Sequence, residues 1–171
     1  MKKYLLLLFV VPVFAFTYAD WVSIKIDDKV SVQFPVQPEN KEMNGNAVWV
    51  SDVNKDSRCM VMLMDFTKFG MDAAQLEQEM AKEESFGQFR DGILGQIEGS
   101  KLIAEKKTKL QGYNTFEFDI NMGKTDTAQL NRMYNKNIFI GSKMYSLSFY
   151  EKNNKPQTEE RNKFFNSFKV N

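Results

Sequence analysis

Residues 59–66 read Cys-Met-Val-Met-Leu-Met-Asp-Phe, a run in which seven of the eight side chains are apolar. Because the side chains of a strand point alternately to its two faces, Cys59, Val61 and Leu63 share one face. Three methionines and Phe66 share the other. A strand that is apolar on both faces is buried on both sides. The run therefore predicts a strand near the middle of a sheet that is covered on both faces.

Alternating segments precede this run. The strands predicted there are Trp21 to Ile26, Val30 to Phe34 and Ala47 to Val53. Asp27-Asp28 forms the turn between the first two, and Pro35 ends the second because proline cannot donate a hydrogen bond to a sheet. The stretch from Pro35 to Asn46 is predicted to be a polar connection. The third strand and the run at 59–66 are predicted to form a hairpin across residues 54–57.

The apolar period changes to that of a helix after Asp72. Asp72 suits the N-cap position, and Gln75 follows three residues later, as in a capping box. The apolar stripe resumes at Phe86 after two glutamates, and glycines weaken it there. We therefore expect one helical stretch from Asp72 with a break between Ser85 and Gly87.

The second half of the chain returns to alternation and then ends in a helix. Between Tyr113 and Asn121, for example, Phe116, Phe118 and Ile120 are expected to point inward. The later strands predicted in this way are Leu102 to Leu110, Tyr113 to Asn121, Leu130 to Ile140 and Lys143 to Glu151. The final helix is predicted to begin near Pro156 and to carry Phe164, Phe165 and Phe168.

This order of elements predicts an α+β fold. Strands come first, then helix, then strands, then helix, and short turns make neighbouring strands antiparallel. We expect a single antiparallel β-sheet of about six to eight strands with helices packed on it, an α-β-α sandwich. Residues 20–171 are expected to form one domain.

The first nineteen residues have the pattern of a secretory signal peptide. Lys2 and Lys3 are followed by an apolar run from Tyr4 to Phe16, shorter than the roughly 20 residues of a membrane span. Thr17 and Ala19 then place small residues where signal peptidase requires them. We expect cleavage after Ala19, no stable membrane insertion afterwards, and a periplasmic or extracellular location.

Charge and chemistry exclude several classes of function. Removing Lys2 and Lys3 from the 23 basic residues leaves 21, against 22 acidic ones. The mature chain therefore lacks the excess of positive charge that is typical of proteins that bind nucleic acid. The absence of histidine removes histidine-activated nucleophiles and the common transition-metal sites. Cys59 is the only cysteine, so the fold has no internal disulfide, and its apolar neighbours predict a buried, inert thiol. A disulfide to another chain stays open.

We expect neither a cofactor nor a bound metal. Met60, Met62 and Met64 lie at alternate positions, which places three thioethers on one strand face about 6.5–7 Å apart. Thioethers suit Cu(I), but methionine is also a common core filler, and the latter interpretation is preferred.

Three residues are candidates for a binding site. Trp49, Arg132 and Tyr134 combine aromatic rings with a guanidinium, the residue types that most often anchor interfaces. The structural alternative is that Trp49 fills the core and that the other two decorate a solvated sheet face.

The whole pattern resembles the PsbP-like superfamily. The residues that carry the resemblance are Val30 to Pro35 with Pro38, the turn at Gly112-Tyr113, Arg132 to Tyr134, Met144 to Leu147, and Phe164 to Phe168. That group includes the extrinsic photosystem subunit, a Ran-binding nuclear import factor and small exported bacterial proteins of unknown role. The resemblance implies an α-β-α sandwich. The members of the group share no active site whose residues could be assigned in this sequence, and a shared fold alone does not establish a shared function.

Two functions follow as hypotheses. The first is an exported, non-catalytic binding or accessory protein of the cell envelope, which engages a protein or an apolar small molecule. The alternative is a carboxylate-dependent hydrolase that acts on envelope glycans, which needs two acidic side chains facing one cleft about 5–10 Å apart.

Overall fold

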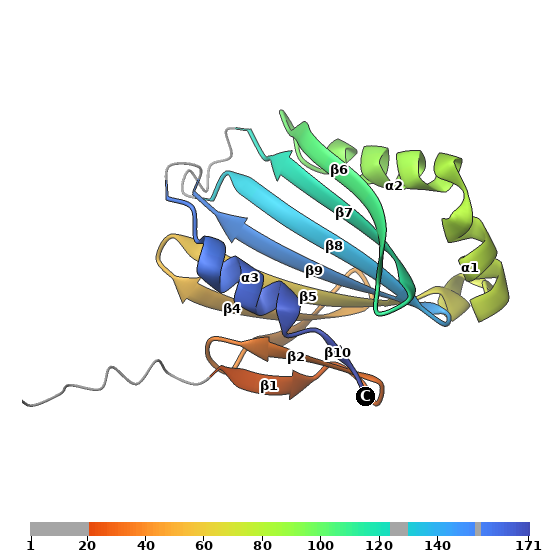
Figure 1. Ribbon diagram of the computed structural model, residues 1–171, viewed down its shortest axis with the longest axis horizontal. Coiled ribbons are helices and arrows are strands. Elements are labelled where there is room, and N and C mark those ends of the chain that lie inside the picture. The colour runs from red at the N-terminus through yellow and green to blue at the C-terminus, as the bar shows by residue number, and fades with distance from the viewer. Residues whose placement is uncertain (1–20, 124–129, 153–154) are drawn as a thin grey trace, which may run out of the picture.

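The computed structural model describes residues 21–123, 130–152 and 155–171 (Figure 1). The strands are β1 Val22–Lys25, β2 Val30–Phe34, β3 Glu39–Met43, β4 Asn46–Asn54, β5 Ser57–Asp65, β6 Lys101–Leu110, β7 Tyr113–Asn121, β8 Arg132–Ile140, β9 Lys143–Glu151 and β10 Lys169–Val170. The helices are α1 Ala73–Ala81, α2 Glu83–Gly95 and α3 Thr158–Asn166, and a 3-10 turn, η1, covers Phe66–Phe69.

The expected signal peptide and its cleavage point after Ala19 lie outside these described residues. Within them, no helix combines the length and the apolar character that crossing a membrane requires.

The larger sheet has seven strands in the order β3-β4-β5-β9-β8-β7-β6, and every neighbouring pair is antiparallel. The strand predicted to be central is β5, which pairs along its whole length with β9 and on its other side with β4. Its two faces enter two different cores. Cys59 and Val61 belong to one core, while Met62 and Met64 pack against the other. The prediction from the run at 59–66 is confirmed.

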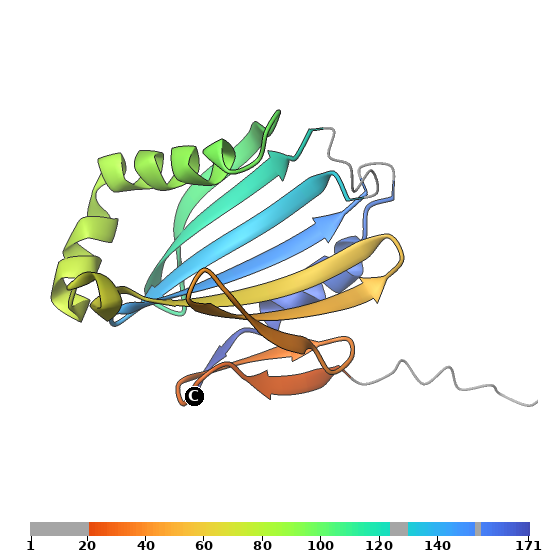
Figure 2. The same ribbon diagram turned by 180° about the vertical axis from the view of Figure 1, so that it is seen from behind.

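Each face of the larger sheet has its own cover. The α3-side core contains Phe164 and Phe165 of α3, together with Leu147 and Phe149 of β9. On the opposite face, the α2-side core contains side chains from α1, α2 and β7, which include Leu76, Met80, Phe86, Phe116, Phe118 and Ile120. Figures 1 and 2 show the sheet with α3 on one side and α1–α2 on the other. The expected α+β class and the inward positions on β7 are confirmed.

The expectation of a single sheet is wrong. The strands β1, β2 and β10 form a separate three-stranded sheet in the order β1-β2-β10. The reason is that the buried face of β2, which carries Val30, Val32 and Phe34, packs onto the α3-side core instead of extending the larger sheet. Pro35 ends β2 at this point, and the next strand starts only at Glu39. The local alternation of β2 could not distinguish these two arrangements.

Two other local predictions need correction. The polar connection between Pro35 and Asn46 contains β3, which is exposed at every position and pairs only with β4 among the described strands. The turn into β4 is Asn44-Gly45, both with positive φ, as a two-residue hairpin requires. The helical break falls at Lys82, because α1 ends at Ala81 and α2 begins at Glu83, so the predicted break was three residues too late. The capping box between Asp72 and Gln75 is present.

An acidic side chain joins the two sheets. Asp27, in the β1–β2 turn, accepts hydrogen bonds from the Lys143 ammonium at 2.8 Å and the Tyr145 hydroxyl at 2.7 Å, both on β9. The backbone amides of Lys29 and Val30 donate to its other oxygen at 2.9 Å. Burial alone would raise the pKa of Asp27, but these four donors outweigh it and lower the pKa from 3.8 to about 2.

We predict that Asp27→Asn lowers the free energy of unfolding by about 2 kcal/mol at pH 7, the size of a charge-assisted hydrogen bond. Since the folded-state pKa is depressed, the stabilisation is present above pH 4 and is lost as the pH falls towards 2. Urea unfolding of both proteins from pH 7 to pH 2 measures this. Asp28→Asn, at the exposed neighbouring position, is the control and should change little. Equal effects of the two substitutions would contradict the interpretation.

Candidate functional site

The structure separates the three candidate residues. Trp49 lies on β4 with a side chain that is only 8% exposed, and it belongs to the α3-side core. Its neighbours across the sheet are Val61 and Asn40, so it is no part of an open site. Arg132 and Tyr134 lie together on β8, with the guanidinium carbon 5.2 Å from the centre of the ring.

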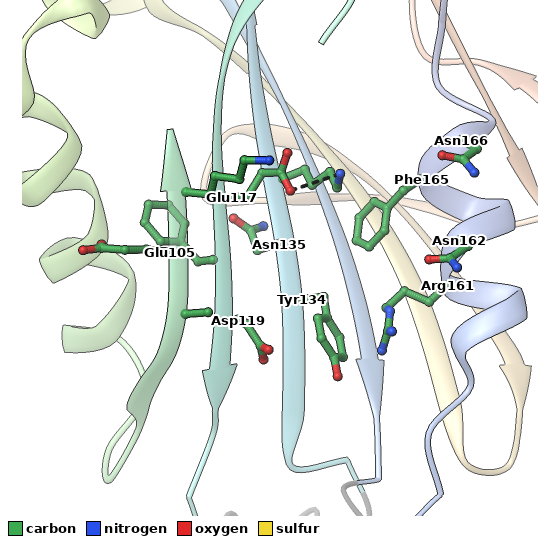
Figure 3. Close-up of a pocket in the computed structure, with 13 residues that line it drawn as sticks. Glu105, Glu117, Asp119, Tyr134, Asn135, Arg161, Asn162, Phe165 and Asn166 are labelled. Carbon is green, nitrogen blue, oxygen red and sulfur yellow. Dashed lines mark ion pairs between the residues drawn. The ribbon is translucent and has the colours of Figure 1, made fainter. Parts of the chain in front are cut away.

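Tyr134 lines a groove between α3 and the outer strands of the larger sheet (Figure 3). The groove has a volume of about 440 Å³. Side chains of α3 form one wall, and strands β6, β7 and β8 form the floor and the far wall. The side chains that line it on the α3 face are Ala104, Lys106, Glu117, Asp119, Tyr134, Lys136, Arg161, Asn162, Phe165 and Asn166.

The topology explains why a groove exists here. Strand β8 is packed against α3 on this face, whereas β6 and β7 extend beyond the helix (Figure 1). Ala104 on β6 is paired with Asp119 on β7. Because its side chain is a single methyl group, it fills little of the groove at this point. Phe118 and Ile120 are buried in the opposite core, so the alternate positions Glu117 and Asp119 must face the α3 side. The amphipathic alternation of β7 therefore supplies the acidic floor.

Two guanidinium groups lie over the ring of Tyr134. The Arg161 guanidinium carbon lies 3.9 Å from the centre of the ring, closer than that of Arg132. A cation over an aromatic face is attracted by the electron density of the ring. Burial raises the pKa of the Tyr134 phenol, and the charge of Arg161 opposes this shift only in part. The ring is thus a neutral, fixed platform between β8 and α3.

Acidic partners fix both arginines. Both oxygens of Asp119 accept from Arg132, each at 2.6 Å, and these bonds raise the pKa of the guanidinium although burial works against them. Arg161 lies 3.2 Å from Glu151, whose side chain is only 2% exposed. The backbone amide of Gln157, just before α3, donates to the other oxygen of Glu151 at 2.9 Å. These bonds position the start of α3 against the sheet.

A third ion pair lies near the end of α3. Lys136 on β8 is 3.2 Å from Glu117 on β7, and its ammonium lies 5.2 Å from the centre of the Phe165 ring. Lys106 on β6 stands opposite Glu117 in the register but makes no ion pair within the described part of the chain. The row Lys106–Glu117–Lys136 therefore carries a net charge of +1.

The groove offers no assembled nucleophile. Cys59 is fully buried on β5, and burial raises the pKa of its thiol to about 12, which fits an inert core residue. Within residues 21–123, 130–152 and 155–171, no cluster of three acidic or cysteine side chains is arranged to hold a metal ion. Met62 and Met64 pack against the α2-side core.

Sequence reasoning missed the residues that α3 contributes. Arg161 and Phe165 are four positions apart, as are Asn162 and Asn166, so each pair shares a face of the helix. That spacing was visible in the sequence. What was absent was any sign of which sheet face α3 covers, because this depends on the packing of Phe164 against Phe34 and Phe149.

Comparison with known proteins defines the fold and no more. No family model matches the sequence, and no curated protein matches it. The solution structure of cyanobacterial PsbP (CyanoP) from Synechocystis sp. PCC 6803 is similar, with a TM-score of 0.59 at 12% identity over 92% of this chain and 96% of that one. The Saccharomyces cerevisiae Ran-binding protein Mog1p gives a TM-score of 0.48 at 13% identity over 89% of this chain and 96% of that one. The PsbP-like fold expected from the sequence is confirmed.

We predict that Arg161→Met lowers the free energy of unfolding by about 3 kcal/mol, because it leaves the buried Glu151 carboxylate without its cation. The double variant Arg161→Met/Glu151→Gln should recover more than half of this loss, since the glutamine still accepts from Gln157 and carries no charge. Chemical denaturation of the two single variants and the double variant gives the coupling energy. Additive effects would mean that the pair does not hold α3.

Proposed function

We propose that this chain is a non-catalytic binding protein of the cell envelope, and that a partner protein docks in the α3 groove. The observation that carries the proposal is the Tyr134 ring, with the guanidinium groups of Arg132 and Arg161 close to it, beside an open groove. Tyrosine and arginine dominate the binding energy of protein interfaces, especially where they are rigid before binding. Here the ion pairs to Asp119 and Glu151 supply the rigidity.

A protein fits this groove better than an apolar small molecule. Small-molecule sites are lined mostly by apolar and aromatic side chains with a few polar groups. This groove is lined by charges of both signs, and Ala104, Tyr134 and Phe165 supply its apolar surface on this face. Charged groups in such a pattern select a partner with complementary charges and steer its approach.

The envelope location in this proposal rests on the N-terminal sequence. Lys2 and Lys3, the apolar run from Tyr4 to Phe16 and the small residues Thr17 and Ala19 have the pattern of an export signal. The near-neutral charge after cleavage gives no reason to place the protein on nucleic acid.

Photo-crosslinking in living cells that naturally produce the protein tests the proposal. A photoreactive residue in place of Asn162, on the groove wall, should give one discrete product of higher mass. A photoreactive residue in place of Ser23, on the outer face of the small sheet, is the control and should not give that product. Adding Asn166→Trp, which fills the groove from an exposed position, should remove the product. Identical products from both positions, or none from Asn162, would overturn the proposal.

One observation keeps the hydrolase alternative open. Glu117 and Asp119 face the same groove two residues apart on one strand, about 6.5–7 Å. This lies within the spacing of catalytic carboxylates. Against it, Asp119 gives both oxygens to Arg132 and Glu117 pairs with Lys136, so neither is left free to attack a glycosidic bond.

We predict that the protein releases no reducing sugar from purified peptidoglycan, and that Glu117→Gln/Asp119→Asn therefore leaves the signal unchanged. The measurement is a reducing-end assay with lysozyme as the positive control. Release by the wild-type protein that the double variant abolishes would establish the hydrolase in place of the binding protein.

A further inference from the structure

Three polar groups on the walls of the groove have no partner among the residues that the structure describes. They are the side-chain amides of Asn162 and Asn166 on α3 and the ammonium of Lys106 on β6. Figure 3 shows Asn162 and Asn166 on the side of α3 that faces the groove. The other charged groups on the α3 face of the groove are paired within the protein. These three groups are therefore free to bind an occupant.

The two amides match the repeat of an extended polypeptide. Asn162 and Asn166 are four residues apart on a helix, a rise of about 6 Å. An extended chain repeats every two residues, at about 6.6–6.8 Å. An asparagine amide offers both a carbonyl acceptor and N–H donors, so it can pair with the N–H and C=O of a peptide unit. Helix α3 is nine residues long, about 13 Å, and so spans about four extended residues.

The charged row Lys106–Glu117–Lys136, which lies opposite α3, determines which side chain of a bound extended segment is favoured there. Lys136 neutralises Glu117 at 3.2 Å, which leaves the +1 charge of Lys106 for the occupant. A carboxylate placed beside Lys106 would complete an alternating row of two cations and two anions. A basic side chain at the same point would meet the unpaired charge of Lys106.

The aromatic rings argue against a glycan as the occupant. Sugars bind proteins largely through open aromatic faces, but Arg161 covers the ring of Tyr134 at 3.9 Å and Lys136 lies over that of Phe165 at 5.2 Å. Phe165 is also mostly buried in the α3-side core. Hydrogen bonds to a peptide backbone, by contrast, need no free ring.

We infer that the α3 groove binds an extended, acidic segment of the partner protein, with Asn162 and Asn166 pairing to its backbone and Lys106 to a carboxylate side chain. This inference rests on the proposed function and adds the chemistry of the occupant. It assigns recognition of the backbone to α3 and recognition of sequence to β6.

Selection from a random nonapeptide library displayed on phage, with the purified protein as bait, tests this assignment. Enriched peptides should carry Asp or Glu at one shared position. Lys106→Glu should shift that position to Lys or Arg, because it reverses the charge of the row. Lys109→Glu is the matched control, since Lys109 is exposed on the same strand but points to the other face, and it should leave the acidic preference unchanged.

A synthetic copy of the most enriched peptide gives the contribution of the amides. Asn162→Ala/Asn166→Ala should weaken its binding at least about tenfold in calorimetry, the loss expected from two hydrogen bonds. No enriched sequence, or no change of preference in Lys106→Glu, would overturn the peptide assignment. Binding of a chitin oligosaccharide that Asn166→Trp blocks would overturn it in favour of a glycan. Cross-links from the Asn162 position would in either case still support a protein-binding groove, so the two failures can be told apart.

Discussion

The central strands β5, β9 and β8 are buried on both faces, and the rest of the structure follows from the need to cover them. Their alternate side chains enter two separate cores, with Val61, Leu147 and Ile138 on one side and Met144 and Phe139 on the other. Burial of apolar surface is the main stabilising contribution available to a chain whose single cysteine forms no internal disulfide. Every other element either adds to this sheet or lies on one of its faces.

The two covers have different origins. On one face, α1 and α2 are a local insert between β5 and β6, and they pack on β7 and β8. On the other, the small sheet and α3 bring together the two ends of the described chain, and Asp27 fixes that assembly to β9. Towards the outer strands this second cover reaches only one end, where Leu110 of β6 and Tyr113 of β7 pack against the α3-side core. Lys106, Glu117 and Asp119 lie beyond that end of the cover, and they line the groove.

Local patterns in the sequence predicted most elements but not how distant segments meet. The alternation of β5 and β7, the capping box at Asp72 and the first two phenylalanines of the final helix are short-range signals, and they proved reliable. Phe168, which was predicted on the same helix, lies beyond the end of α3. The small sheet, the edge strand β3 and the burial of Trp49 depend on contacts between remote residues, which alternation does not encode. Asn44-Gly45 is typical of a two-residue hairpin turn and could have predicted β3. The polar composition of the segment favoured a loop instead. For the site, the sequence brought Arg132 and Tyr134 together, whereas Arg161 could be placed beside them only once the position of α3 was known.

The ion pairs of the groove are better suited to holding a shape than to adding stability. An exposed pair contributes little, and a buried pair must first offset its desolvation. Here the pairs link β7 to β8 and, through Arg161 and Glu151, tie α3 to the sheet, and two guanidinium groups lie over the Tyr134 ring. A groove fixed in this way loses little conformational entropy when it is occupied, so more of the contact energy contributes to affinity. Because the internal charges are matched, the discrimination among partners falls to the few groups left unmatched, chiefly Lys106 and the amides of α3.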